Sequence, residues 1–467
     1  MKIRGLIAGV LLALFFPAQA EQKPNFLIIA IDDLNDYVGC LGGHPDTKTP
    51  NIDKLANQGI LFTNAHCNSP VCNSSRASIW TGLRPSTTGI TTNHTGYFRE
   101  NPEYKNLHCL PQTMQASGYS TTAFGKVYHL GAKIDASTDW QQLRTYRYGP
   151  LLKTHLNFHT GDRLTDWGVL PSGDHPRIGM LPSDPEAPSF DEDIARRTIE
   201  FLGDSHNVPF FLGCGFFRPH TPLYSRKKHY DRFPIEEISI PEVQEDDIED
   251  LPYFKAKPRR EQDIEAPGLW NHQWITENGK WKDILQAYFA AIASTDDKVG
   301  EVMAALQQSE FSENTYVILF SDHGWNLGEK EHWGKAALWE QTTRVPFIIY
   351  GPGIPAGIRC SKPVELLSIY PTVLDYAGIE QPHSLEGVSL RPLLEDPESE
   401  WDHPALTTFS DHHALRTERW RYIRYVDGSE ELYDHDTDPN EWSNLSQENH
   451  PELPVLRRQL EEILTRP

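Results

Sequence analysis

Cys72 and Arg76 are the residues whose types and spacing are best suited to chemistry in this sequence. They lie four residues apart, about one helical turn, so a helix that starts near Cys72 would place both on one face. A helix N-terminus and a nearby guanidinium each lower the pKa of a cysteine and make its thiolate a nucleophile. A small, inert cysteine buried in a loop fits this segment equally well. The segment alone therefore gives only a candidate nucleophile.

Two acidic clusters follow apolar runs that predict buried strands. Residues 25–31 end at Asp32-Asp33, and residues 315–320 lead to Asp322-His323. Ligands bind at the carboxyl ends of strands in open α/β sheets, so we expect the two clusters to converge. Adjacent carboxylates repel each other unless a cation or donors compensate, and oxygen ligands suit a hard cation. A helix cap would use only one of the aspartates, so a metal site is the favoured interpretation.

Basic residues follow two further predicted strands. Lys126 and His129 come after a run at 119–124 and, three residues apart, would share one face of a turn. His220 follows the apolar run 209–216 and lies between two prolines that restrict its backbone. Taken singly, such residues are more often solvated surface or structural histidines. They gain meaning only from the other motifs.

Several motifs, in this order, resemble the signature segments of the formylglycine-dependent type I sulfatases, most closely the iduronate-2-sulfatase-like branch. The matching segments are Thr49 to Ala56, Cys72 and Arg76 with Thr81-Gly82-x-Arg84, Gly125-Lys126-Val127-Tyr128-His129, Arg218-Pro219-His220-Thr221-Pro222, Asp322-His323-Gly324 with Lys335, and 431–445. Ser74 departs from the pattern, because the family usually has proline or alanine there. The resemblance covers almost the whole chain after residue 20.

The resemblance implies that a formylglycine-generating maturation enzyme oxidises Cys72 to formylglycine (3-oxoalanine). The hydrate of this residue would attack sulfur and form a covalent sulfoenzyme, with Arg76 and His129 holding and deprotonating the hydrate. The residues implied to bind the sulfate are Lys126, His220 and Lys335. His220 would also act as the acid for the leaving oxygen.

The resemblance also implies one divalent cation, with Ca²⁺ as the family's ion. The implied ligands are Asp32, Asp33, residue 72, Asp322 and His323. Calcium tolerates irregular shells of six to eight oxygen ligands. Histidine suits calcium poorly in general, which leaves magnesium and manganese open.

Charge and the N-terminal segment limit the partners and the location. The net charge of -22 argues against nucleic-acid binding and disfavours anionic substrates unless positive charge is concentrated locally. Residues 1–20 have a basic start, an apolar core and an Ala-Gln-Ala end, which predicts a signal peptide and an exported protein, periplasmic or secreted. The apolar core is too short to span a membrane, and no other run is long enough.

The predicted fold class is α/β, with an alkaline-phosphatase-like large mixed or parallel sheet flanked by helices and a smaller C-terminal antiparallel subdomain. We expect residues 21–397 to form the catalytic domain and 398–467 the subdomain, where short strand-like pieces alternate with turns. Residues 131–205 show little periodicity and predict long loops. The run 281–306 predicts a helix whose Asp296-Asp297 pair lies on a solvated face.

The favoured function is hydrolysis of sulfate esters of a sulfated polysaccharide or oligosaccharide. Alternatives are a phosphoesterase or phosphonate hydrolase of the same superfamily, and a catalytically silent glycan-binding homologue that Ser74 would explain. Aromatic and basic side chains that could contact the sugars are Trp325, Trp333, Trp339, His94, Tyr97 and Arg99. Tryptophans that simply fill the core are the other interpretation.

Overall fold

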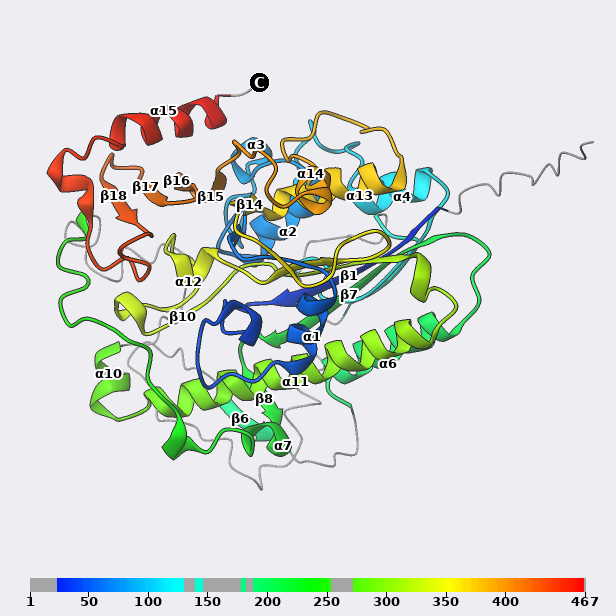
Figure 1. Ribbon diagram of the computed structural model, residues 1–467, viewed down its shortest axis with the longest axis horizontal. Coiled ribbons are helices and arrows are strands. Elements are labelled where there is room, and N and C mark those ends of the chain that lie inside the picture. The colour runs from blue at the N-terminus through cyan, green and yellow to red at the C-terminus, as the bar shows by residue number, and fades with distance from the viewer. Residues whose placement is uncertain (1–22, 130–138, 146–177, 182–187, 253–271, 466–467) are drawn as a thin grey trace, which may run out of the picture.

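The computed structural model describes residues 23–129, 139–145, 178–181, 188–252 and 272–465. The predicted signal peptide, residues 1–20, lies outside the described residues. An eight-stranded mixed sheet runs through the centre of the molecule in the order β13-β2-β12-β9-β1-β7-β4-β5 (Figure 1). Its strands are β1 (Asn25–Asp32), β2 (Ile60–Phe62), β4 (Ser120–Gly125), β5 (Gln142–Arg144), β7 (Phe210–Pro219), β9 (Thr315–Ser321), β12 (Phe347–Tyr350) and β13 (Ile358–Cys360).

Strand β1 is central because both of its faces are buried. Leu27 and Ile29 belong to one hydrophobic core, while Phe26 and Ile28 belong to the other. This explains the continuous apolar run at 25–31, which is typical of a strand covered by helices on both sides. Strands β7 and β9 flank β1 in parallel, so their carboxyl ends meet at one edge of the sheet.

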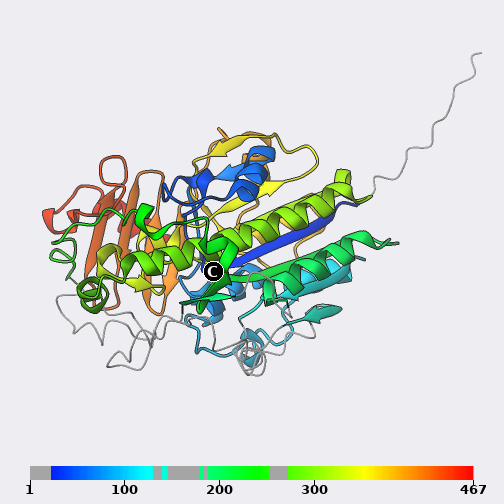
Figure 2. The same ribbon diagram turned by 90° about the horizontal axis from the view of Figure 1, so that it is seen from below.

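Helices cover both faces of the sheet (Figures 1 and 2). On one side lie α1 (Pro50–Gln58), α6 (Phe190–Gly203), α7 (Lys227–Tyr230) and α11 (Trp281–Gln308). On the other lie α2 (Cys72–Thr81), α3 (Pro85–Thr88), α4 (Leu110–Ala116), α13 (Ile369–Ala377) and α14 (Arg391–Glu395). The remaining elements of the large domain are β3 (Ala65–His66) paired with β14 (Val364–Glu365), β6 (Ile178–Leu181) with β8 (Leu223–Arg226), β10 (Asn326–Leu327) with β11 (Trp333–Gly334), and α10 (His272–Glu277) and α12 (Glu340–Thr343). The predicted fold class is confirmed.

The expectation of loops throughout 131–205 is wrong for its last part, which contains α6. Ser189 and Glu192 form a capping box that starts this helix. Ile194, Ala195 and Leu202 then form a buried stripe against the sheet and α11. The acidic residues of the first turn, of which Asp191 is itself buried, interrupt the apolar pattern and hid this short period.

The C-terminal part folds as a four-stranded antiparallel sheet beside the large domain, as predicted (Figure 1). Its strands are β15 (Ala405–Phe409), β16 (His412–Arg416), β17 (Trp420–Arg424) and β18 (Glu430–Asp434), followed by α15 (Leu453–Leu464). Leu456 and Leu460 of α15 pack on one face of this sheet with Leu415 and Tyr422. No helix in the described part of the chain is long and apolar enough to cross a bilayer.

Candidate active site

The polar residues at the ends of β1 and β9 meet, because these two strands pair in parallel. The backbone N–H of Asp33 donates to Asp322 Oδ1 at 3.2 Å, and His323 Nε2 lies 3.2 Å from Asp33 Oδ1. Asp32, at the end of β1, is fully buried beside them. The two acidic clusters therefore form one buried group at the carboxyl edge of the sheet.

Cys72 is the first residue of α2, and its sulfur lies within this group. Sγ is 3.3 Å from His323 Nε2, 3.0 Å from Lys335 Nζ and 3.5 Å from Lys126 Nζ. Burial raises the pKa of the thiol, but Lys126, Lys335 and His323 outweigh it, so the pKa lies well below its ordinary value. Cys72 thus lies where positive charge is concentrated in an otherwise acidic protein.

Arg76 lies one turn after Cys72 on α2, and its guanidinium is buried under the site. Nε donates to Asp322 Oδ2 at 2.7 Å and Nη2 donates to Asp32 Oδ1 at 3.3 Å. Nη1 donates to the backbone carbonyl of Lys126. Arg76 therefore joins α2 to both strand ends and to the segment after β4.

The two lysines reach Cys72 from opposite parts of the chain. Lys126 follows β4 and forms an ion pair with Asp32, while Lys335 follows β11 and lies 2.9 Å from Asp33 Oδ1. Burial and Cys72 raise the pKa of Asp32, but Lys126, His220 and Arg76 outweigh them and lower it to about 2. Asp32 is therefore ionised at any ordinary pH.

Both predicted histidines also face the site. Cys72 and His129 are hydrogen-bonded, and burial lowers the pKa of His129, which favours the neutral imidazole. His220 Nε2 lies 3.8 Å from Asp33 Oδ2 and 4.0 Å from Asp32 Oδ2. The other nine residues singled out in the sequence thus contact Cys72 or the carboxylates beside it.

The carboxylate of Asp33 has one atom that suits a cation. Its Oδ2 is buried and accepts no hydrogen bond from the described residues. Donor atoms of Asp32, Asp33, Cys72 and His323 all lie within 4.8 Å of one another. An orphaned carboxylate oxygen among several ligand atoms fits a divalent cation. The predicted ligand Asp322 is not part of this set, and its Oδ2 accepts a hydrogen bond from Arg76 Nε.

Tyr288 supports Asp33 and was not identified from the sequence. Asp33 has a φ of 60°, a left-handed conformation that is unusual for a side chain other than glycine. The Tyr288 hydroxyl donates to the Asp33 carbonyl at 2.7 Å and accepts the Asn35 N–H at 3.0 Å. Tyr288 is one of many residues on the buried face of α11, so the sequence around it gives no sign of this role.

Asp139 was also missed, and it joins two segments of the site. Its buried carboxylate accepts hydrogen bonds from the hydroxyls of Tyr128 (2.9 Å) and Tyr97, and from Arg99 Nε (3.0 Å) and Nη2 (2.7 Å). Tyr128 precedes His129, while Tyr97 and Arg99 belong to the loop after the nucleophile helix. A lone aspartate before a tryptophan carries no pattern that would reveal this role.

The expected contact of the three tryptophans with sugars is wrong, whereas His94 is exposed and stays a prediction. Trp333 and Trp339 are each 1% exposed and Trp325 is 7% exposed, because they fill the space between elements. Arg99 is held by Asp139 and Tyr97 is buried, so neither presents its polar group to a substrate. The interpretation that these tryptophans fill the core is the correct one.

Comparison with known proteins agrees with this geometry. The sulfatase family model matches residues 24–379, and the N-sulphoglucosamine sulphohydrolase C-terminal model matches residues 328–466. A sulfatase of Formosa agariphila is 38% identical, covering 91% of this chain and 83% of that protein. Mouse iduronate 2-sulfatase is 31% identical, covering 81% of this chain and 73% of its own length. The chain belongs to the sulfatase family and is a sulfuric ester hydrolase.

A solved structure with another activity shares the fold. The phosphonate monoester hydrolase of Agrobacterium radiobacter superposes with a TM-score of 0.72 at 22% identity, covering 95% of each chain. At this identity the likeness establishes the alkaline-phosphatase-like architecture only, because one fold hosts several activities.

Proposed function

We propose that this enzyme hydrolyses sulfate esters of a sulfated carbohydrate, with residue 72 as formylglycine supplying the nucleophile. The observation that carries the proposal is the contact of Cys72 Sγ with Lys335 and Lys126 at the edge of the acidic group. Two ammonium groups beside the nucleophile suit a sulfuryl group whose oxygens gain negative charge in the transition state.

Each surrounding residue has a role that its position supports. His129, which burial keeps neutral, accepts a proton from the hydroxyl of the hydrate at residue 72. Lys126 and Lys335 hold the sulfate oxygens. His220 donates a proton to the leaving oxygen. Arg76 holds the carboxylates of Asp32 and Asp322 in position relative to α2. The remaining hydroxyl of residue 72 then loses its proton, expels sulfate and restores the aldehyde.

One divalent cation, for which Ca²⁺ is our choice, would be held by Asp32, Asp33, residue 72, Asp322 and His323. When bound, it would offset negative charge on the sulfuryl oxygens. The fit rests on the orphaned Asp33 Oδ2 and on the donor set of Asp32, Asp33, Cys72 and His323, in which an oxygen at residue 72 would make oxygens the majority.

Maturation and location belong to the same proposal. A formylglycine-generating enzyme would convert Cys72, and the basic and apolar N-terminal segment would direct export to the periplasm or medium. We place the boundary between catalytic domain and subdomain near residue 398, shortly before β15.

Peptide mass analysis around residue 72 tests the nucleophile. We expect active enzyme to carry an aldehyde at this position, which reduction by borohydride converts to an alcohol. Fully active protein with an intact thiol at residue 72 would show the mechanism to be wrong. Inactive protein with an unmodified Cys72 in its native host would instead favour a silent binding protein.

The substrate class requires a separate comparison. The family membership and the likeness to iduronate 2-sulfatase support a sulfated sugar, whereas the shared fold keeps a phosphonate ester as the second candidate. We expect kcat/KM to be higher for sulfated oligosaccharides than for an aryl sulfate, choline sulfate or a phosphonate monoester. High salt should slow desulfation, since a negatively charged protein attracts an anionic glycan only through a local basic site. Preference for a phosphonate would favour the alternative.

A further inference from the structure

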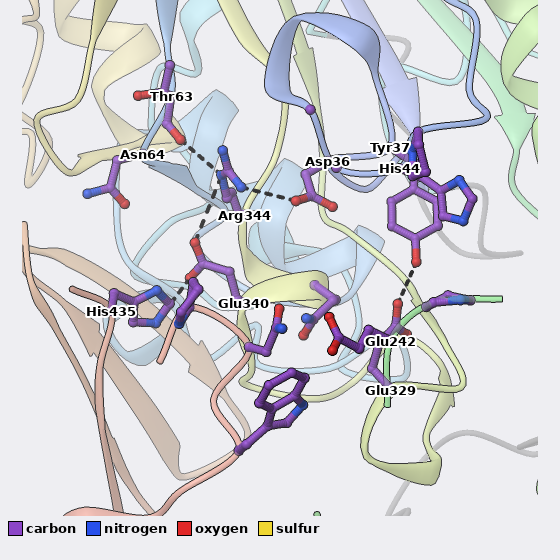
Figure 3. Close-up of a pocket in the computed structure, with 18 of the residues that line it drawn as sticks. Asp36, Tyr37, His44, Thr63, Asn64, Glu242, Glu329, Glu340, Arg344 and His435 are labelled. Carbon is purple, nitrogen blue, oxygen red and sulfur yellow. Dashed lines mark hydrogen bonds and ion pairs between the residues drawn. The ribbon is translucent and has the colours of Figure 1, made fainter. Parts of the chain in front are cut away.

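A cavity whose lining does not include Cys72 lies where the large domain meets the C-terminal subdomain (Figure 3). Its volume is about 700 Å³, within the range of sites that hold small organic ligands. Its lining includes the loop after β1, the segment of α12, residues 239–242 and residues 435–442 of the subdomain. It is therefore built from both parts of the molecule.

Backbone hydrogen bonds connect the wall of the cavity to the segment that follows His323 in the candidate active site. The carbonyl of Gln341 accepts the Trp325 N–H at 2.9 Å, and the carbonyl of Thr342 accepts the Gly324 N–H at 2.8 Å. Gly324 directly follows His323, which contacts Cys72 Sγ in the candidate active site. Asp36, another residue of the wall, lies three residues after Asp33.

Ion pairs hold the charged groups of the wall in place. Arg344 Nη1 donates to Asp36 Oδ2 at 3.1 Å, and its Nε donates to the Thr63 carbonyl at 2.9 Å (Figure 3). The Tyr37 hydroxyl donates to Glu329 Oε1 at 2.6 Å. Asp36 and Glu329 are 9% and 8% exposed, so these groups are nearly fixed. A preorganised polar wall binds a ligand with little loss of side-chain entropy.

The composition of the wall excludes two kinds of ligand. Six carboxylates face two arginines, which disfavours a sulfated or otherwise anionic sugar. A metal ion on Glu340, His435 and Glu441 is disfavoured because Arg421 already pairs with both glutamates. His435 Nε2 is also bonded to Glu441 Oε1 at 3.0 Å.

The remaining surface suits hydroxyl groups and the apolar face of a ring. The side-chain amides of Gln341 and Asn440 line the cavity and form no hydrogen bond with any described residue. Trp442 lies in the wall and is only partly buried, and the indole of a tryptophan offers both a flat apolar surface and an N–H donor. Paired carboxylates can still accept hydrogen bonds from hydroxyls.

We propose that this cavity is an accessory subsite that binds an uncharged sugar unit of a glycan chain. The inference rests on the proposed carbohydrate function, because it assigns the cavity to unsulfated sugars of the same class of polymer. The sulfated unit would go to the basic site at Cys72 and an unsulfated unit to this cavity.

Binding of neutral hexasaccharides tests the subsite independently of sulfatase turnover. Galactan, glucan, mannan and xylan hexasaccharides would be titrated into the mature enzyme and followed by calorimetry. We expect at least one to saturate with a Kd on the order of 1 mM or tighter. Trp442→Ala should weaken that binding by about fivefold or more. Trp420→Ala, a partly buried tryptophan of the same subdomain outside the cavity, should leave it unchanged.

Turnover of an aryl sulfate provides the control for fold and catalysis. Both tryptophan variants should hydrolyse it at the rate of the unchanged enzyme. If no neutral hexasaccharide saturates, or if Trp420→Ala weakens binding as much as Trp442→Ala, the subsite does not exist. If neutral sugars bind through Trp442 but no sulfated glycan is hydrolysed, the subsite stands and the proposed carbohydrate substrate is wrong.

Discussion

Lys335 and Lys126 supply the positive charge that an acidic protein needs at a site for an anion. Each ammonium group contacts Cys72 Sγ and a carboxylate of the β1 end. Lysines placed in this way can stabilise charge on a sulfuryl group only if they keep both contacts. The roles of the individual residues stay predictions, and two of them are tested at this scale.

Replacing Lys335 by alanine should lower kcat by about 10²- to 10³-fold, because one donor to the transferring group is lost. Lys362→Ala is the matched control, since Lys362 pairs with Glu418 at the surface. Steady-state kinetics on an aryl sulfate measures the effect. An unchanged kcat in Lys335→Ala would contradict the assignment.

Adding Ca²⁺ to chelator-treated enzyme should raise the Tm, because a cation would bind the orphaned oxygen of Asp33 in the folded state only. At a calcium concentration of 100 times the Kd, the expected stabilisation is about 2.7 kcal/mol. Asp33→Asn should abolish the rise, whereas Asp36→Asn should retain it, since Asp36 pairs with Arg344. An equal rise in both variants would place the ion elsewhere.

At the scale of elements, the geometry of the site depends on hydrogen bonds that hold the loops around it in place. Asp139 fastens the Lys126–His129 segment through Tyr128, and Asn73 fastens the loop 92–96 through hydrogen bonds to its carbonyls. Helix α2 ends at Gly82, whose φ of 70° and close contact with Leu385 exclude a side chain.

Tyr128→Phe should reduce kcat/KM while costing only about 1 kcal/mol of stability, the net value of a hydrogen bond. The expected cause is movement of the adjacent His129. Tyr97→Phe removes the other hydroxyl from the same Asp139 carboxylate and is the matched control. Thermal unfolding and kinetics should show similar Tm values for the two variants but lower activity for Tyr128→Phe. Equal activities would mean that Asp139 serves stability alone.

Asp296 corrects the expectation of a solvated face on α11. Its buried carboxylate accepts the N–H groups of Asn51 (3.1 Å) and Ile52 (2.8 Å), so it caps the start of α1. Asp296→Ala should lower the free energy of unfolding by about 1 kcal/mol or more, as for other lost caps. Asp283→Ala, on the same helix, should have little effect. Denaturant unfolding distinguishes the two, and equal values would contradict the capping role.

At the scale of the whole molecule, buried neutral histidines should make the fold sensitive to acid. Burial lowers the pKa of both His332 and His413 to about 4, against 6.5 in the unfolded chain. As the pH falls below 6.5, the unfolded state therefore binds protons first, and stability is lost until about pH 4.

Each histidine should contribute a slope of at most about 1.4 kcal/mol per pH unit within that window. His413→Gln should flatten the dependence of unfolding free energy on pH, whereas His94→Gln, at an exposed position, should not. Urea titrations between pH 7 and pH 4.5 measure this. An identical slope in His413→Gln and the unchanged enzyme would show that this histidine is not the cause.

Local patterns were sufficient for the central strands β1, β7 and β9 and for the C-terminal sheet. Continuous apolar runs predicted β1, β7 and β9, because strands buried on both faces need them. The order of the motifs predicted the family, and the clusters that follow β1, β7 and β9 meet because these parallel strands end at one edge.

Other features depend on contacts between residues far apart in the chain. Tyr288, Asp139 and Asp296 act through hydrogen bonds to residues far away in the chain, and no spacing rule encodes such partners. The three tryptophans near Lys335 looked like a surface for sugars, yet packing buried them. The cavity at Trp442 exists only where the subdomain meets the catalytic domain. Burial and partner choice arise when separate segments come together, which is why only the tertiary structure determines them.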